Sequence, residues 1–216
     1  MFEIPMAAAG ITVVTPAPVP GPSLADAALA ALSSSSGSVV VGGISFGAHL
    51  AAEWAVANPS RCVGLVLALP AWHGEPGTAP ASRSALLSAA AVRSSGVAGA
   101  LSGSELPRWL ADELARAWHG YGDGLAESLE VAAARPAPTL AELATLDVPV
   151  GIAACADDPV HPASVADEWA TALPCASVCR TRLSIMGVDR EALGRAAVLA
   201  FLRAAGGTPG RTPCRR

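Results

Sequence analysis

The sequence contains no lysine, so all 14 basic residues are arginine, and with 18 acidic residues the net charge is −4. The arginines form no stripe of the kind that follows a phosphate backbone, so we expect no nucleic-acid partner. Charged residues make up only 15% of the 216 residues and apolar residues 52%. A chain of this length and composition can bury a sizeable core, and one domain is the default expectation.

Signals for secretion and for membrane insertion are also missing. The first residues, Met1–Pro5, carry no basic side chain ahead of an apolar stretch, as a secretory signal would require. No continuous apolar run of about 18 residues is evident, which argues against a membrane span. We therefore expect a cytoplasmic protein with a small-molecule substrate and no membrane partner, although it could form a homo-oligomer.

The cysteines do not follow a metal-binding pattern. There are five of them, and none belongs to paired C-x-x-C motifs. Cys175 and Cys179 lie four positions apart, but no histidine lies near them to complete a zinc site. We expect no metal and no cofactor.

The most informative stretch is the one around Ser45. Three valines, 39–41, lead into Gly43-Ile44-Ser45-Phe46-Gly47, and a helix-forming sequence follows. This G-x-S-x-G spacing is typical of a serine exposed on a sharp turn from a strand to a helix. Such a turn leaves little room for Cβ atoms, so we expect it to need both glycines. The amides that begin the helix would face an oxyanion formed beside the serine.

Strand-like and helix-like segments alternate along the chain. This order predicts an α/β fold with a mostly parallel sheet of about five strands flanked by helices. The expected strands are 11–15, 38–44, 62–69, 148–155 and 177–185, and the expected helices between and after them are 23–32, 46–57, 163–172 and 189–205.

The region 71–147 lacks any strand-like run and is rich in helical segments at about 83–92, 107–119 and 124–134. We interpret it as a helical cap inserted between two strands, over the sheet edge where ligands of open α/β sheets bind. The alternative is a set of extra crossover helices with no lid role. We expect a single domain over residues 1–205 and a flexible tail over 206–216.

Taken together, the G-x-S-x-G turn, the cap and the Asp158-Pro159-Val160-His161-Pro162 loop occur in the order of the α/β-hydrolase fold family. The chain resembles a short, N-terminally reduced member of that family over about residues 38–205. The resemblance implies that Ser45 is the nucleophile and Asp158 the triad acid, with Asp157 as the fallback. It also implies a serine hydrolase acting on a small ester or thioester.

Two departures from the family pattern concern the base and the oxyanion site. The family places its catalytic histidine just before the last helix, where this chain has Met186-Gly187. No His-Gly oxyanion motif precedes Ser45, so the chain is either a minimal member or a truncated one. Without a base a serine hydroxyl stays protonated and is a poor nucleophile, so it is uncertain that the protein is an enzyme.

Four histidines remain as candidates for the base. His161 is preferred because its loop follows a sheet strand, although a local turn hydrogen bond to Asp158 is the simpler interpretation. His73 is the second choice and would otherwise line the pocket. His49 lies one helical turn after Ser45, which favours a packing role. His119 ends a cap helix, where its charge would be favourable.

The remaining candidates concern the oxyanion and the pocket. The backbone N–H of Phe46 would be the first oxyanion donor. The second would come from the proline-rich loop 16–22, where only Ala17, Val19 and Gly21 have an amide proton. Three tryptophans around the cap suggest an apolar pocket there: Trp72, Trp109 and Trp118. The rival hypothesis is a catalytically impaired hydrolase-fold protein that binds an apolar small molecule, with Ser45 only a small residue in a tight turn.

Overall fold

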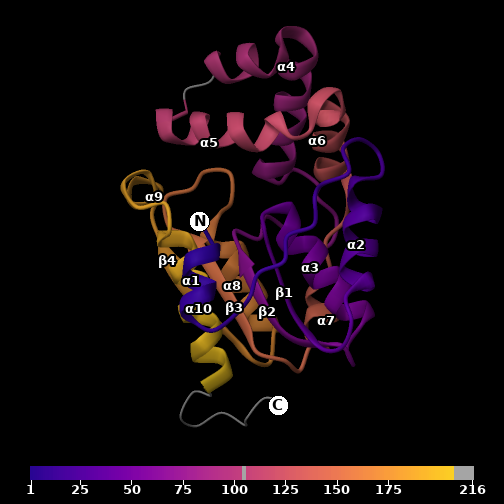
Figure 1. Ribbon diagram of the computed structural model, residues 1–216, viewed down its shortest axis with the longest axis vertical. Helices are drawn as coiled ribbons and strands as arrows, with labels where there is room; N and C mark the ends of the chain where they lie inside the picture. Colours follow the sequence, from indigo (N-terminus) through magenta and orange to yellow (C-terminus); the bar gives the residue numbers. More distant parts are fainter. Residues whose placement is uncertain (104–105, 207–216) are drawn as a thin grey trace.

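The computed structural model describes residues 1–103 and 106–206. Figure 1 shows a twisted sheet between helices, with a group of helices above one end of it. In chain order the elements are α1 (Glu3–Ala8), α2 (Leu24–Ser34), β1 (Val39–Ile44), α3 (Phe46–Ala57), β2 (Cys62–Ala68), α4 (Pro80–Ser102), α5 (Arg108–His119), the 3₁₀ helix η1 (Gly122–Gly124), α6 (Leu125–Ala134), α7 (Leu140–Leu143), β3 (Val150–Cys155), α8 (Ala163–Ala172), β4 (Ala176–Thr181), α9 (Leu183–Val188) and α10 (Ala192–Gly206).

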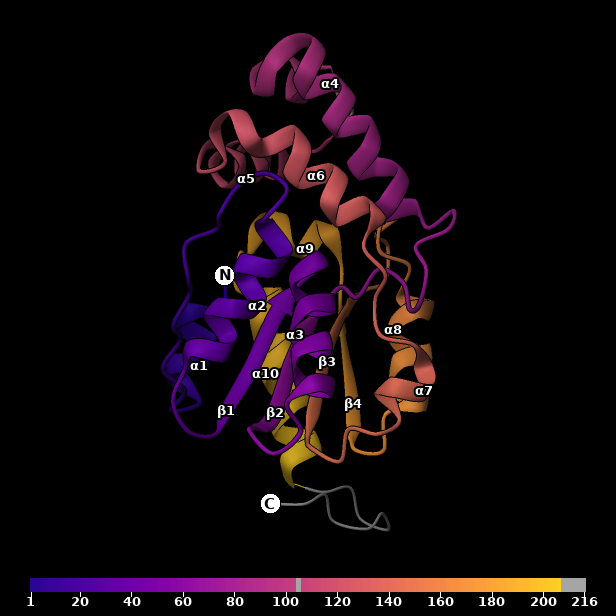
Figure 2. The ribbon, with the colours of Figure 1, turned by 90° about the vertical axis from the view of Figure 1, so that its right-hand side faces the viewer.

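The sheet has four parallel strands in the order β1-β2-β3-β4. The expected α/β class with a mostly parallel sheet is confirmed, with four strands in place of about five. One face packs against α2, α3, α7 and α8, and the other against α1 and α10 (Figures 1 and 2). Parallel strands are joined by helical crossovers, so helices come to cover both faces of the sheet.

Residues along β2 alternate between two cores. Leu65 and Leu67 belong to the core on the α3 side, whereas Val66 and Ala68 belong to the core on the α10 side. This alternation follows from the two-residue period of a strand. At Gly151 in β3, a Cβ atom would lie 2.5 Å from the Cα of Phe201, so a glycine there lets α10 approach the sheet closely.

The expected strand over 11–15 is wrong, because the structure forms no strand there. The segment runs alongside β1 toward the cap (Figure 2), but a cavity separates it from β1. The Ile11 amide donates to the carbonyl of Met6 rather than to a strand. A run of β-branched residues forms a strand only where a neighbouring strand supplies hydrogen-bond partners.

The last expected strand, 177–185, is too long. β4 ends at Thr181, whose carbonyl accepts the last ladder bond, from Ala156. The carboxylate of Asp157 then accepts a 2.7 Å hydrogen bond from the amide of Leu183, the first residue of α9. An acidic group at the first amide of a helix stabilises the start of that helix, so the chain turns into α9 where the sequence pattern continues as a strand.

Helices α4, α5 and α6 lie beyond the carboxyl ends of the strands (Figure 2). The two chain segments that lead to them and back meet at Gly74 and Ala137, where the Ala137 amide donates a 2.8 Å hydrogen bond to the Gly74 carbonyl. Arg135, which directly follows α6, pairs with Glu53 of α3 at 2.8 Å. The proposed cap range 71–147 and the single domain 1–205 stay predictions, and the proposed tail 206–216 lies outside the described residues except for Gly206.

The longest helix, α4, bears on the expectation about membrane spans. By length and composition alone, α4 could cross a membrane, with a mean hydropathy of 1.2 over its best window. Gly96 has a non-helical conformation (φ 69°, ψ 177°) and breaks the helix. At 1.5 Å per residue the longer piece, 80–95, spans about 24 Å, whereas a bilayer core is about 30 Å thick.

Candidate active site

Ser45 occupies a strained turn between β1 and α3. Its backbone has φ 53° and ψ −118°, a conformation that residues other than glycine rarely adopt. The turn is held by bonds from the Ser45 amide to the Ala68 carbonyl and from the Ala48 amide to the Ser45 carbonyl, each 2.9 Å. Backbone strain of this kind persists where the surrounding structure fixes it, and it holds the Ser45 side chain clear of the sheet.

The two glycines of the G-x-S-x-G motif are not equivalent. A Cβ atom on Gly43 would overlap the carbonyl of Gly47 and lie 2.8 Å from the amide of Ala48. A Cβ atom on Gly47 would meet nothing within 4 Å. The expectation that both glycines are sterically needed is therefore correct only for Gly43.

The structure brings Ser45, His161 and Asp158 into one chain of hydrogen bonds. The distance from Ser45 Oγ to His161 Nε2 is 2.8 Å, and from His161 Nδ1 to Asp158 Oδ2 it is 2.9 Å. The imidazole and carboxylate are largely buried, with side-chain exposures of 16% and 7%. Ser45 comes from the β1–α3 turn, and the other two come from the loop after β3. Both segments end at the same edge of the parallel sheet.

Asp158 uses its two oxygens for different purposes. Oδ1 accepts hydrogen bonds from the amides of Val160 and His161, at 2.8 and 3.1 Å, and Oδ2 pairs with the imidazole. Burial works to raise the pKa of Asp158. The hydrogen bond and charge of His161 and the two amides outweigh that effect and hold the pKa below its usual value. The local turn bond and the contact between His161 and Ser45 thus exist together.

The other candidate residues lie apart from this group. The carboxylate of Asp157 accepts the hydrogen bond from the Leu183 amide at the start of α9. His73 Nε2 pairs with Glu168 of α8 at 3.1 Å on the surface rather than with Ser45. His119 ends α5 in an exposed position. Trp72 is buried below the site, with its ring edge-on to His49 at a centroid distance of 4.5 Å.

His49 is a buried histidine under the candidate site. Its Nε2 accepts hydrogen bonds from the amides of Ala71 and Trp72, at 3.0 and 3.4 Å, and its ring stacks on Trp169. Burial, with a smaller contribution from the charge of His161, lowers the pKa of His49 to about 3. The imidazole is therefore neutral near pH 7, and it fixes the chain where β2 leads out toward the cap. This supports the packing role expected for it.

The buried His49 makes stability depend on pH. The folded protein binds no proton at this site until about pH 3, whereas the unfolded chain binds one below about pH 6.5. The free energy of unfolding should therefore fall as the pH drops below 6.5, with a slope that approaches about 1.4 kcal/mol per pH unit near pH 5. Urea unfolding at pH 7, 6 and 5 should show this slope in the wild type and a flatter one in His49→Asn. The control His119→Asn should keep the wild-type slope, and equal slopes in all three proteins would contradict the assignment.

The oxyanion candidates are partly resolved. Phe46 is the first residue of α3, and the first amides of a helix have no acceptor within it, so its N–H is available beside Ser45. Of the three candidates in the proline-rich loop, Gly21 is engaged, because its amide donates to Ser128 Oγ of α6 at 2.7 Å. Ala17 and Val19 remain as candidates for the second donor.

The position where the family pattern expects a histidine has another role here. Met186 and Gly187 lie in α9, and Met186 is buried in the core on the α10 side. A Cβ atom on Gly187 would lie 2.8 Å from the indole of Trp109 in α5, so the small residue lets α5 pack on α9. This contact joins distant parts of the chain, and no local sequence signal points to it.

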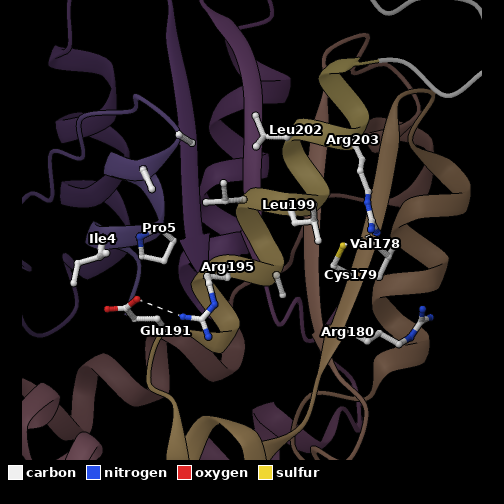
Figure 3. A pocket seen from close by; sticks show the side chains of 14 residues that line it. Ile4, Pro5, Val178, Cys179, Arg180, Glu191, Arg195, Leu199, Leu202 and Arg203 are labelled. Carbon is white, nitrogen blue, oxygen red and sulfur yellow. Dashed lines mark hydrogen bonds and ion pairs between the residues drawn. The ribbon is translucent and has the colours of Figure 1, made fainter.

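A cavity of about 780 Å³ lies elsewhere, between α1, β4 and α10 (Figure 3). Ile4, Leu199 and Leu202 give it apolar walls, and none of the candidate site residues lines it. Of its three arginines, Arg195 pairs with Glu191 and Asp189, and Arg180 pairs with Asp167. Arg203 donates a hydrogen bond to Cys179 Sγ instead. Among the described residues, no group of three or more His, Cys, Asp and Glu side chains could hold a metal ion.

No protein-family model and no curated protein matches the sequence. Solved structures do match it. A thermophilic esterase from Thermogutta terrifontis aligns with 86% of this chain and 76% of its own, at 19% identity and a TM-score of 0.58. A hydrolase from Pseudomonas aeruginosa PA01 aligns with 88% of this chain and 74% of its own, at 25% identity and a TM-score of 0.57. An alpha/beta hydrolase enzyme from a Medee basin deep-sea metagenome library aligns with 91% of this chain and 75% of its own, at 16% identity and a TM-score of 0.61.

The chain has the α/β-hydrolase fold. The likeness expected from the sequence is thus confirmed at the level of the fold. Within this α/β-hydrolase fold the four strands, the turn at Ser45 and the loop after β3 are all present. The described part of the chain has no strand on the free side of β1.

Proposed function

We propose that the protein is a serine hydrolase that cleaves a small ester or thioester through Ser45. The observation that carries the proposal is the pair of contacts made by His161, 2.8 Å to Ser45 Oγ and 2.9 Å to Asp158 Oδ2. A nucleophile, a base within hydrogen-bond reach and a third group that orients the base form the constellation that activates a serine. The esterase and hydrolases of the same fold add support for this type of reaction.

In this mechanism the Ser45 hydroxyl donates its proton to His161 Nε2 while Oγ attacks the substrate carbonyl carbon. Asp158 remains ionised, accepts the hydrogen bond from Nδ1–H and stabilises the imidazolium. The Phe46 amide, with Ala17 or Val19 as the second donor, stabilises the oxyanion. His161 then protonates the leaving alcohol or thiol, and water releases the acyl group by the same steps.

The cap suggests the kind of substrate. Helix α5 has none of its residues fully buried, yet it carries Trp109 near its start and Trp118 near its end, with Trp109 packed on α9. Large apolar side chains over the strand ends favour an acyl or alkyl group of modest size near Ser45. We propose no cofactor and place the reaction in the cytoplasm.

The proposal is tested with a fluorophosphonate probe, which reacts only with an activated serine. We expect one probe per wild-type molecule, measured by intact mass spectrometry, and none in Ser45→Ala. Ser35→Ala, which removes another serine near the surface, is the control and should label like the wild type. Folded wild-type protein that takes up no probe would contradict the hydrolase. That result would favour a catalytically impaired protein that binds an apolar small molecule.

A further inference from the structure

The free side of β1 faces a cavity of about 390 Å³, which we call the β1 slot. One wall is β1 itself, from Val40 to Ile44, and the opposite wall is the segment 11–16. Strand β1 is an edge strand, since it pairs only with β2. In Figure 2 the segment 11–16 rises beside β1 toward the cap.

Backbone groups of β1 point into this slot. The amides of Val39 and Ser45 bond toward β2, to Arg61 and Ala68. Successive residues of a strand turn their N–H and C=O groups to opposite edges, so the intervening Val40, Gly42 and Ile44 turn theirs to the slot. In the described part of the chain no residue of 11–16 bonds to these three. All three residues are exposed, so the slot presents an unpaired strand edge whose donors and acceptors another strand could satisfy.

The slot lies in the plane of the sheet, between the two helix layers. Ala28 and Leu32 of α2 line it on one side, and Phe2 and Met6, at the N-terminal end and in α1, line it on the other. A group that fills it therefore continues the sheet and is covered on both faces. Strands covered on both faces are apolar on both faces rather than alternating.

The segment 11–16 is anchored at its start and again five residues beyond its end. At its start, the amide of Ile11 donates to the Met6 carbonyl, which ties the segment to α1. After it, the amide of Gly21 bonds to Ser128 of α6 at 2.7 Å. Between these two contacts, both within the described residues, the segment 11–16 makes no backbone hydrogen bond to β1.

We propose that the β1 slot binds an extended, uncharged polypeptide strand from a separate partner protein, which pairs with β1 as a fifth strand. Backbone hydrogen bonds to Val40, Gly42 and Ile44 give this β-augmentation its affinity, and apolar side chains on both faces of the strand give it selectivity. The lining contains no charged side chain, which suits an uncharged partner strand. Natural edge strands are usually protected by charge or proline, and β1 has neither.

A second copy of this chain is a poorer fit to the slot. Its own β1 edge lies behind its own 11–16 segment, and the contacts at Ile11 and Gly21 anchor that stretch of chain in each copy. A second copy therefore has no free strand to donate from this region. A separate protein with an exposed apolar strand meets the requirement without unfolding either partner.

The test uses the intact protein and a capped synthetic peptide with the sequence of residues 10–16, which is uncharged and rich in β-branched residues. A photo-activatable diazirine replaces the side chain corresponding to Val13. We expect saturable cross-linking, mapped by mass spectrometry to 40–44, 11–16 and α2. The same peptide with N-methyl groups on alternate residues cannot form the ladder and should lose at least ten-fold in yield.

On the protein side, Val40→Pro removes an amide that faces the slot and leaves the bonds between β1 and β2 in place. It should lower the yield at least ten-fold, while Leu199→Lys in the exposed groove on α10 should not change it. The N-methylated peptide keeps the test valid if Val40→Pro fails to fold. The proposal would be overturned if both peptides labelled the protein equally, or if the cross-links were confined to other surfaces. It would also be overturned if no cross-linking occurred at millimolar peptide, or if the protein alone sedimented as a dimer.

Discussion

Replacing His161 with alanine should lower kcat/KM for a p-nitrophenyl ester by on the order of 10⁴-fold or more. His161 is placed to take the proton, because its Nε2 lies 2.8 Å from Ser45 Oγ. Without it the Ser45 hydroxyl remains protonated near neutral pH and attacks slowly. The residual rate would come from the oxyanion amides and from substrate binding. Steady-state kinetics on purified protein measure the effect, with circular dichroism to show that the variant is folded.

Combined variants make this prediction sharper. Residues that act as one unit are not additive, so Ser45→Ala combined with His161→Ala should be no slower than either single variant. His73→Ala and His119→Ala are the matched controls, since each removes a histidine that lies apart from Ser45. We expect both to stay within about two-fold of the wild type. If His73→Ala were the inactive variant and His161→Ala active, the assignment of the base would be wrong.

The elements whose signals are local could be predicted from the sequence. Helices α3 and α8 begin and end at the expected residues, Phe46–Ala57 and Ala163–Ala172. Each is bounded by a strong local signal: the glycine turn and Asn58-Pro59 bound α3, and Pro162 bounds α8. The alternation of buried strands and helices likewise sufficed to predict the fold class.

The base could not be settled from the sequence, because the contact that decides it joins residues 116 positions apart. The spacing of Asp158 and His161 is equally compatible with a local turn and with a relay to Ser45. In the structure Asp158 makes both kinds of hydrogen bond, one kind through each oxygen. The sequence poses these as alternatives, and only the position of the loop after β3 beside Ser45 shows that they coexist.

Both failed strand predictions were decided by contacts outside the segment concerned. The segments 11–15 and 182–185 have residues suited to strands, but strand propensity depends on pairing with a neighbour. The first segment lies across the β1 slot from β1, and the second begins α9 because Asp157 binds its first amide. Neither the slot nor the Asp157 contact can be recognised from the residues of these two segments alone.

Replacing Gly43 with alanine should destabilise the protein by about 3 kcal/mol, at the upper end of the cost of overpacking, and should slow labelling of Ser45. The new methyl group would overlap the Gly47 carbonyl and lie 2.8 Å from the Ala48 amide. These neighbours are backbone atoms in the first turn of α3, so they can move only if the turn that carries Ser45 opens. The two measurements are urea unfolding and the rate of fluorophosphonate labelling.

The matched control for this prediction is the other glycine of the same motif. Gly47→Ala places its methyl group where no atom lies within 4 Å, and Gly47 lies in the first turn of α3. Alanine is the better helix former, so we expect this variant to be unchanged or up to about 1 kcal/mol more stable. The motif would then require glycine at position 43 and tolerate alanine at position 47. Equal destabilisation by both substitutions would show instead that the turn depends on backbone flexibility at each position rather than on the contact at Gly43.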